Sequence, residues 1–185
     1  MKFLEFLLII FISLTTSIKA DLNKNLMNQL EDGEKLIFIR HAYAPGSGDP
    51  SNFNLNDCST QRNLSKEGRK QAQKIGEFFT NNNIKIEKVF SSEWCRCKET
   101  ALLAFNDYST KNFLNSFYSS KYKKNKTKQI EKLNDYVQQF KSSKNLVLVT
   151  HYVLISEVLN YAPSSGEIVV SDKNFNMIGS IEINY

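Results

Sequence analysis

Two runs of strand-like apolar residues each lead to one of the chain's two histidines. The first run covers residues 36–39 and is followed by Arg40 and His41, and the second covers residues 146–149 and is followed by Thr150 and His151. Continuous apolar and β-branched runs are typical of central strands that are covered on both faces. Ligands of open α/β sheets bind at the carboxyl ends of the strands. The pattern predicts two imidazoles at one edge of a sheet, although a chance placement would give the same spacing.

Helical and strand-like patterns alternate along the rest of the chain. Helices are predicted over residues 21–34, over 66–80 after the N-cap residue Ser65, and over 94–105, 127–140 and 153–159. Strands are predicted over 35–40, 88–91, 146–150, 167–171 and 178–183, with a short one within 111–118. This alternation predicts an α/β fold, a three-layer sandwich with a mainly parallel central sheet flanked by helices.

A long polar loop follows the first predicted strand. Residues 44–50 are rich in glycine and proline, and the segment stays polar as far as Asn63. Loops of more than about 12–15 residues in a compact domain are usually functional. Because this loop begins directly after His41, we expect it to contribute to a site there.

The first twenty residues have the pattern of a secretory signal peptide. A basic start at Lys2 precedes an apolar stretch over residues 6–14, and a more polar segment then ends at Ala20, where cleavage is expected. The apolar stretch is too short for an ordinary transmembrane span, but an uncleaved anchor stays open because Ile18 is bulkier than the preferred residue at that position. Residues 21–185 then form a single domain without stable membrane insertion.

The net charge favours a small anionic ligand over a nucleic acid. The chain carries +5, and +4 once the signal peptide is removed with its two lysines and one glutamate. This balance is far from that of a nucleic-acid-binding protein. Five lysines within residues 121–128 form either a solvated segment or a patch that steers an anionic substrate.

Three cysteines follow the signal peptide: Cys58, Cys95 and Cys97. In an oxidising compartment the count favours one disulfide and one remaining thiol. Cys95 and Cys97 are too close to pair with each other inside a helix, so Cys58 is expected as one partner, the alternative being three thiols. No Cys-x-x-Cys spacing indicates a zinc site.

Four residues stand out as candidates for chemistry: Arg40, His41, Arg96 and His151. Right-handed crossovers would bring the strand ends that precede them to one edge of the sheet. Two guanidinium groups and two imidazoles at that edge would form a pocket for a dianion. Guanidinium forks bind phosphate oxygens bidentately, and a neutral imidazole nitrogen can attack phosphorus without first losing a proton.

The blocks around these residues resemble one known family. LIFIRHA at 36–42 is similar to the signature of the histidine phosphatase superfamily, which has the phosphoglycerate-mutase-like fold, with Ala42 where glycine is usual. NLSKEGRKQA at 63–72, SSEWCRCKETA at 91–101 and VLVTH at 147–151 resemble three further blocks of the family. The four blocks occur in the family's order and span about residues 35–160.

The resemblance implies a two-step phosphoryl transfer. His41 would become phosphohistidine and water would release phosphate, while Arg40, Arg96 and His151 hold the equatorial oxygens. No metal or other cofactor is required in this scheme, because the arginines supply the positive charge. The expected protein is a phosphomonoester hydrolase acting on a small or sugar-linked phosphate in the bacterial periplasm. Its oligomeric state stays open.

The proton donor for the leaving group is not evident. Residues 113–117 contain no carboxylate where mutase-like members have a glutamate, and Tyr152 stands where acid-phosphatase members have an aspartate. Asp49, Asp57 and Glu99 are candidates, although Asp49 also suits a turn before Pro50 and Glu99 suits an ion pair with an arginine. Further expectations concern substrate binding by Arg62 and Asn63, with Tyr43 and Trp94 near the entrance.

Three other functions fit parts of the pattern. A non-catalytic phosphate-binding pseudophosphatase would keep the pocket and lack the acid. A phosphohistidine protein phosphatase would need little acid, because a nitrogen-linked phosphate leaves readily. A metal-dependent hydrolase would use the two histidines as ligands.

Overall fold

A computed structural model describes residues 24–184, so the predicted signal peptide, residues 1–20, lies outside the described residues. Within that range, one six-stranded sheet has the order β3-β2-β4-β1-β5-β6. The strands are β1 (Leu36–Arg40), β2 (Ile86–Ser91), β3 (Ser109–Thr110), β4 (Asn145–Thr150), β5 (Ile168–Ser171) and β6 (Met177–Ile181).

The two strands that precede the histidines are neighbours in the middle of the sheet. β1 pairs in parallel with β4, and β2 pairs in parallel with both β4 and β3. β5 and β6 add an antiparallel edge next to β1. The sheet is therefore mainly parallel, and β1 and β4 are covered on both faces, as their apolar runs predict.

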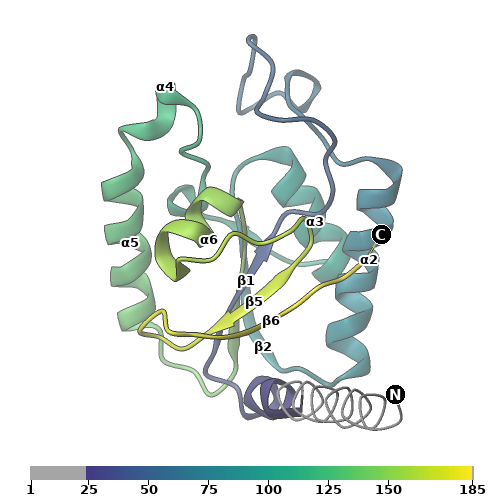
Figure 1. Ribbon diagram of the computed structural model, residues 1–185, viewed down its shortest axis with the longest axis vertical. Coiled ribbons are helices and arrows are strands. Elements are labelled where there is room, and N and C mark those ends of the chain that lie inside the picture. Colours follow the sequence, from purple (N-terminus) through teal and green to yellow (C-terminus); the bar gives the residue numbers. More distant parts are fainter. Residues whose placement is uncertain (1–23, 185) are drawn as a thin grey trace, which may run out of the picture.

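Helices cover both faces of this sheet, giving three layers (Figure 1). Residues 24–32 are helical, and the other helices are α2 (Lys66–Asn81), α3 (Cys95–Phe105), α4 (Ser120–Lys123), α5 (Lys126–Gln139) and α6 (Tyr152–Leu159). α5 and α6 pack with Phe38 and Leu148 on one face, while α2, α3 and the helix at 24–32 pack with Ile37 and Val149 on the other. Alternate side chains of the same strands thus serve opposite layers.

The predicted strand within residues 111–118 is wrong. The two-residue strand β3 ends before this segment, and a 3-10 helix, Asn112–Leu114, follows it. Phe113 and Leu114 are buried from this turn, and Thr150 donates a hydrogen bond of 2.7 Å to the Leu114 carbonyl. Because the 3-10 turn already directs these apolar side chains into the core, the segment can bury them without pairing as a β-strand. The short helix α4 after it was not predicted.

The start of α2 holds the beginning of the long loop. The Ser65 side chain accepts a hydrogen bond from the Gly68 amide, as its N-cap position predicts. A Cβ atom at Gly68 would lie 2.0 Å from the Tyr43 carbonyl oxygen, so only glycine permits this approach. Ser65 N also donates to that carbonyl. The segment just after His41 is therefore fixed against the first turn of α2.

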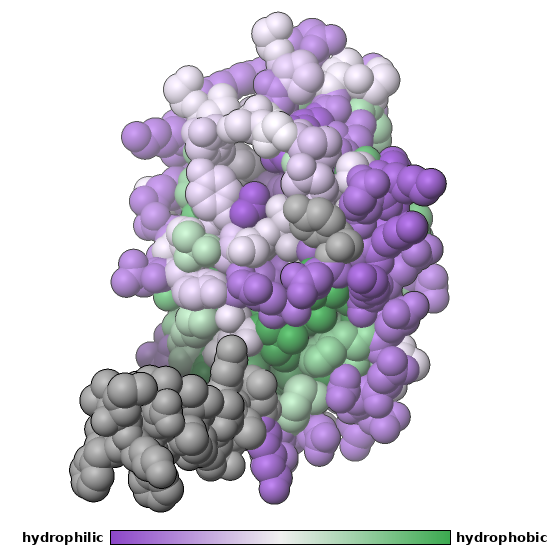
Figure 2. Space-filling view, turned by 45° about the vertical axis from the view of Figure 1, so that its right-hand side comes forward, coloured by the Kyte–Doolittle hydropathy of each residue, from purple (hydrophilic) through white to green (hydrophobic). Residues whose placement is uncertain are grey.

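The loop that follows runs above the carboxyl end of β1 in Figure 1. In the view of Figure 2, hydrophilic residues dominate the surface and hydrophobic ones gather in one area of its lower half. No helix within residues 24–184 is long and apolar enough to span a membrane.

Candidate active site

A cavity of about 300 Å³ opens at the carboxyl ends of the central strands. Arg40, His41, Arg96 and His151 all line it, and they come from the ends of β1 and β4 and from the first turn of α3. The fold therefore brings together the four residues that the sequence singled out. The long loop forms part of the wall through a group that includes residues 46–51, Phe53 and Arg62.

His41 is buried and oriented by three contacts. Its backbone amide donates to the Thr150 carbonyl, which ties the residue to β4. Its Nδ1 lies 2.8 Å from the Ala42 carbonyl oxygen, and its Nε2 accepts a hydrogen bond of 3.2 Å from Nε of Arg96. Because a carbonyl only accepts and Arg96 only donates, these partners assign the neutral tautomer with the proton on Nδ1. Nε2 then carries a lone pair.

Burial lowers the pKa of both histidines well below its usual value. For His41 and His151 alike, burial is the largest cause and the charge of Arg96 the next. The two rings lie 5.6 Å apart between centroids in an edge-to-face arrangement. His151 Nε2 lies 2.9 Å from Ser92 Oγ and 3.5 Å from Cys97 Sγ. Both imidazoles are therefore neutral at ordinary pH, and each has a defined neighbour.

Arg96 is the centre of the site. Its side chain is almost completely buried, and its Nη1 and Nη2 atoms donate to Oδ1 and Oδ2 of Asp49 at 2.6 and 3.2 Å. Nη1 also donates to the Arg62 carbonyl at 3.3 Å. Thr100 accepts from the Ala42 amide and donates to the Arg96 carbonyl, so it connects the α3 backbone to the segment after β1. One guanidinium thus contacts both the His41 ring and a carboxylate.

Asp49 is the only carboxylate among the described residues that line this cavity. Besides Arg96, the Trp94 Nε1 and the Arg62 amide donate to it, at 3.0 and 3.2 Å. Burial acts to raise the pKa of the Asp49 carboxyl, but the hydrogen bond and charge of Arg96, with the hydrogen bonds from Trp94 and the Arg62 amide, outweigh it, and the pKa is lowered. In this arrangement Asp49 is an anion paired with Arg96.

Two more arginines face the same cavity. Arg40 donates from Nη1 to the Pro163 carbonyl at 2.8 Å, and its guanidinium lies 5.4 Å from the centroid of the Tyr152 ring. Among residues 24–184, its buried Nε has no hydrogen-bond partner. Arg62 donates to the carbonyls of Ala44 and Gly48. Burial lowers the pKa of both arginines, in keeping with cationic groups held close to one another and to Arg96.

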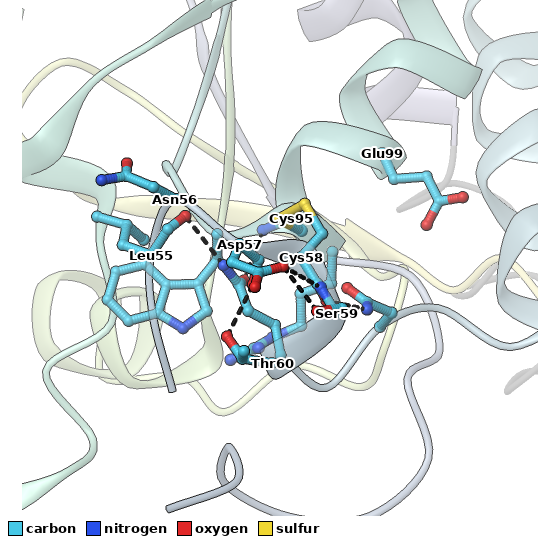
Figure 3. Close-up of a disulfide and its surroundings, with 12 residues drawn as sticks. Leu55, Asn56, Asp57, Cys58, Ser59, Thr60, Cys95 and Glu99 are labelled. Atoms are coloured by element: carbon cyan, nitrogen blue, oxygen red, sulfur yellow. Dashed lines mark hydrogen bonds between the residues drawn. A yellow bond between two sulfur atoms is a disulfide. The ribbon is translucent and has the colours of Figure 1, made fainter. Parts of the chain in front are cut away.

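Three of the sequence candidates lie outside the cavity. Asp57 is exposed and caps a 3-10 turn, Cys58–Thr60, where hydrogen bonds from Ser59 lower its pKa. Glu99 projects from α3 away from the disulfide (Figure 3) and forms a 2.6 Å ion pair with Arg69. The Asn63 side chain donates to the Cys58 carbonyl at 2.6 Å. Local structure accounts for each of these polar groups.

A disulfide attaches the long loop to α3. Cys58 pairs with Cys95, with 5.7 Å between their Cα atoms (Figure 3). Cys95 directly precedes Arg96, so the crosslink joins the loop to the turn that carries this arginine. Gln61 accepts from the Cys95 amide at 2.9 Å. Cys97 is a free, buried thiol, and burial raises its pKa to about 12, which keeps it protonated.

Several contributing residues were missed from the sequence. Ser92 Oγ contacts His151 and donates to Asn115 Oδ1 at 3.1 Å, and Asn115 also accepts from the Glu93 amide. The serine pair in the block at 91–101 is the one signal that pointed to Ser92. The cavity is also lined by Trp94, as expected, and by four aromatic side chains that were not expected there: Phe53, Tyr118, Tyr122 and Tyr152. Tyr43, which was also expected near the entrance, lines a different cavity that Arg40 borders as well.

No group of three or more histidine, cysteine, aspartate or glutamate side chains in the described part of the chain is arranged to hold a metal ion. The positive charge that the cavity offers to an anion comes from Arg40, Arg62, Arg96 and Lys121. Such a site can bind a phosphoryl group through guanidinium donors and present a neutral imidazole nitrogen to it.

Comparison with known families identifies one match. The model of the histidine phosphatase superfamily (branch 1) matches residues 36–115, the segment that contains Arg40, His41 and Arg96. None of the curated proteins matches the chain at a significant level.

Solved structures with the same fold are distant in sequence. A protein histidine phosphatase, SixA, in complex with tungstate is 13% identical over 77% of this chain and 92% of its own, with a TM-score of 0.51. A mycobacterial glucosyl-3-phosphoglycerate phosphatase, Rv2419c, in complex with VO3 is 13% identical over 75% and 92%, with a TM-score of 0.55. A phosphoglycerate mutase from Thermus thermophilus is 17% identical over 81% and 99%, with a TM-score of 0.53. At these identities the likeness establishes the fold.

Proposed function

The chain belongs to the histidine phosphatase superfamily, and we propose that it is a metal-independent phosphomonoesterase that forms a phosphohistidine on His41. The observation that carries this proposal is the contact between Arg96 Nε and His41 Nε2. It leaves the imidazole neutral, with its unprotonated nitrogen beside the fixed positive charge of Arg96. A nucleophile and an anion-binding group are thereby held on the same side of the ring.

In the first step, Nε2 of His41 gives up its hydrogen bond from Arg96 and attacks phosphorus with the freed lone pair, and the P–O bond breaks with its electron pair on the leaving oxygen. Arg40 and Arg96 hold the non-bridging oxygens and stabilise the charge that spreads over them in the transition state. In the second step water attacks phosphorus, the P–N bond breaks, and its electron pair returns to Nε2. His151 contributes a hydrogen-bonding edge to the same phosphoryl group.

We further propose that the substrate is a phosphorylated small molecule or sugar and that the protein acts in the bacterial periplasm. The signal-peptide pattern supports export, and the Cys58–Cys95 disulfide supports folding in an oxidising compartment. The cavity, about 300 Å³ in volume, is large enough for a phosphate ester with a compact leaving group.

One observation favours a second function, that of a non-catalytic phosphate-binding module. Asp49 engages the same Arg96 atoms that a phosphoryl group would need. A carboxylate fixed there would permit weak anion binding and block turnover. A phosphohistidine protein phosphatase is a further alternative within the enzyme class, since SixA is a protein histidine phosphatase of the same fold.

The protein without the predicted signal peptide, residues 21–185, should be assayed with p-nitrophenyl phosphate, whose leaving group needs little protonation. We expect turnover that persists in EDTA, is inhibited by vanadate, and passes through an acid-labile, base-stable phosphoenzyme in rapid-quench experiments. Loss of activity in EDTA would indicate a metal-dependent hydrolase. No turnover at any pH between about 4 and 8, the range that brackets histidine titration, would favour the binding module.

A further inference from the structure

The hydrogen-bonding capacity of Arg96 is nearly used up. A guanidinium has five N–H donors. The Nε–H goes to His41, Nη1 donates to Asp49 and to the Arg62 carbonyl, and Nη2 donates to Asp49. Within residues 24–184 this leaves a single N–H. A phosphoryl group that is to be held by both Nη atoms must therefore replace the Asp49 carboxylate.

Asp49 is suited to such a replacement. Its two oxygens bridge the Nη atoms much as two phosphate oxygens would, because carboxylate and phosphate both match the guanidinium fork. The bond to Arg96 is one of several: Trp94 Nε1 and the Arg62 amide also donate to the carboxylate. These two donors come from other groups, so they would keep the side chain at the cavity wall after it leaves Arg96.

The loop around Asp49 allows a change of conformation. Gly46 and Gly48 have φ angles of +87° and +66°, in the region that favours glycine, and an added Cβ at Gly48 would meet nothing within 4 Å. The disulfide at Cys58 holds the far end of the loop on α3. A small shift of residues 46–49 could therefore occur while the loop as a whole keeps its place.

We propose that Asp49 is the exchangeable proton donor of the site: it holds the Arg96 fork before substrate binds, yields the fork to the phosphoryl group, and then protonates the leaving oxygen. This inference rests on the proposed phosphomonoesterase function. Asp49 fits the role because it is the only carboxylate among the described cavity-lining residues. Its oxygens already occupy the place where the oxygens of the phosphoryl group must bind. A carboxyl group displaced from there by the substrate stays within proton-transfer reach of the bound ester.

The protons and bonds balance over the cycle. Asp49 takes up one proton as the phosphate ester binds, either from the monoanionic ester or from solvent. His41 Nε2 then bonds to phosphorus, the P–O bond breaks with its electron pair on the leaving oxygen, and the Asp49 O–H proton moves to that oxygen. In the second step water attacks phosphorus, the P–N bond breaks with its electron pair returning to His41 Nε2, and the protons of the water leave with the phosphate.

Electrostatics favour proton uptake once Arg96 is engaged elsewhere. Burial already acts to raise the pKa of the Asp49 carboxyl, and the hydrogen bond and charge of Arg96 are the largest of the contacts that lower it. A phosphate anion in the fork would remove that contact and place negative charge next to the carboxyl. Both changes raise the pKa. Substrate binding would thereby convert an ion-pair partner into an acid.

The test compares Asp49→Asn with a matched control, Asp57→Asn, which alters an exposed carboxylate of the same loop outside the cavity. We expect Asp49→Asn to reduce kcat for an alkyl ester such as glucose 6-phosphate by about 10²–10⁴-fold, the usual contribution of an acid catalyst. Turnover of p-nitrophenyl phosphate should change by less than about threefold, because nitrophenolate leaves without protonation. Inorganic phosphate should inhibit the variant at several-fold lower concentration, since the competing carboxylate is gone.

Asp49→Glu should recover part of the alkyl-ester rate, because it keeps the carboxyl. Equal losses on both substrates, with weaker inhibition by phosphate, would overturn the proposal and make Asp49 a permanent positioning partner of Arg96. Unchanged alkyl-ester turnover in Asp49→Asn would place the acid elsewhere. Either result leaves the proposed function intact as long as the wild type hydrolyses p-nitrophenyl phosphate. Failure of the wild type on that substrate would instead refute the function itself.

Discussion

The Nε–H of Arg96 donates a hydrogen bond of 3.2 Å to Nε2 of His41. This contact does two things at once. It assigns the imidazole proton to Nδ1, where the Ala42 carbonyl accepts it, and it places a fixed cation beside the nitrogen that would attack phosphorus. The cation lowers the pKa of His41, in addition to burial. Both effects keep His41 neutral at ordinary pH.

The two histidines should differ in their importance for turnover. His41→Ala removes the attacking nitrogen, so hydrolysis of p-nitrophenyl phosphate should fall below detection and no phosphoenzyme should form. His151→Ala removes one polar group that supports the phosphoryl oxygens, which costs about 10²–10³-fold in kcat. Steady-state rates and rapid-quench trapping of the phosphoenzyme measure both effects. Similar residual rates in the two variants would contradict the assignment of His41 as nucleophile.

Arg96→Lys should lose most of the activity although it keeps the charge. A lysine ammonium cannot contact His41 and both oxygens of a bidentate anion at once, because it has no planar fork. We expect a decrease in kcat/KM of about 10²-fold or more, with weaker inhibition by vanadate. A suitable control is Lys98→Arg, which should behave like wild type. Lys98 is partly buried, lies two residues further along α3, and does not line the cavity.

The disulfide should contribute substantially to stability. Cys58 and Cys95 are separated by 37 residues. Closing a loop of this size stabilises the folded state by about 3–4 kcal/mol in the chain-entropy model. The Cys58→Ser variant should therefore unfold at a lower urea concentration than wild type. Its unfolding midpoint should match that of wild type measured in the presence of a reductant.

The number of free thiols gives an independent check of that pairing. Denatured protein that has not been reduced should react with one equivalent of an alkylating reagent, at Cys97. Three reactive thiols in material purified from an oxidising compartment would contradict the disulfide. Reduction should leave the stability of Cys58→Ser unchanged.

The stability of the fold should fall as the pH is lowered from 7.5 to 5.5. Burial, followed by the charge of Arg96, lowers the pKa of His41 and His151 in the folded state. In the unfolded chain both histidines take up protons near pH 6.5, so the unfolded state binds more protons below that pH. Stability is therefore fully present above about pH 7 and is lost towards the folded-state pKa. The loss at pH 5.5 is about 1.4 kcal/mol for each histidine.

Urea unfolding at the two pH values measures this effect. The chain contains only these two histidines, so His151→Gln should remove about half of the pH dependence. Equal unfolding free energies at pH 7.5 and 5.5 would show that the imidazoles are not buried in the neutral form.

The sequence carried most of the information about the fold because the central strands are encoded locally. The apolar runs at 36–39 and 146–149 form β1 and β4, which are adjacent and parallel, and the helical periodicities give α2, α3, α5 and α6. The one wrong strand, within 111–118, lies where apolar residues are buried from a single 3-10 turn. Such a turn has no period of its own that a short apolar segment could reveal.

The arrangement of polar groups around the cavity could be predicted only in part. Four of the polar residues lie at the ends of strands or at the start of a helix, so the regular elements of the fold determine their positions: Arg40, His41, Arg96 and His151. Asp49 lies eight residues after His41 in an irregular loop, and nothing in the local sequence distinguishes it from Asp57. The difference between them is made by contacts with Arg96 and Trp94, which are more than forty residues away.

By itself, the sequence determined the α/β layers, the two histidines at one edge of the sheet, and Cys58 as one half of any disulfide. These follow from hydrophobic periodicity and from the spacing of residues within one element. The tertiary structure alone decided which cysteine pairs with Cys58, which carboxylate faces the cavity, and which aromatic residues besides Trp94 form its wall. Those relationships join segments that are distant in the chain, and they exist only once the sheet has brought the segments together.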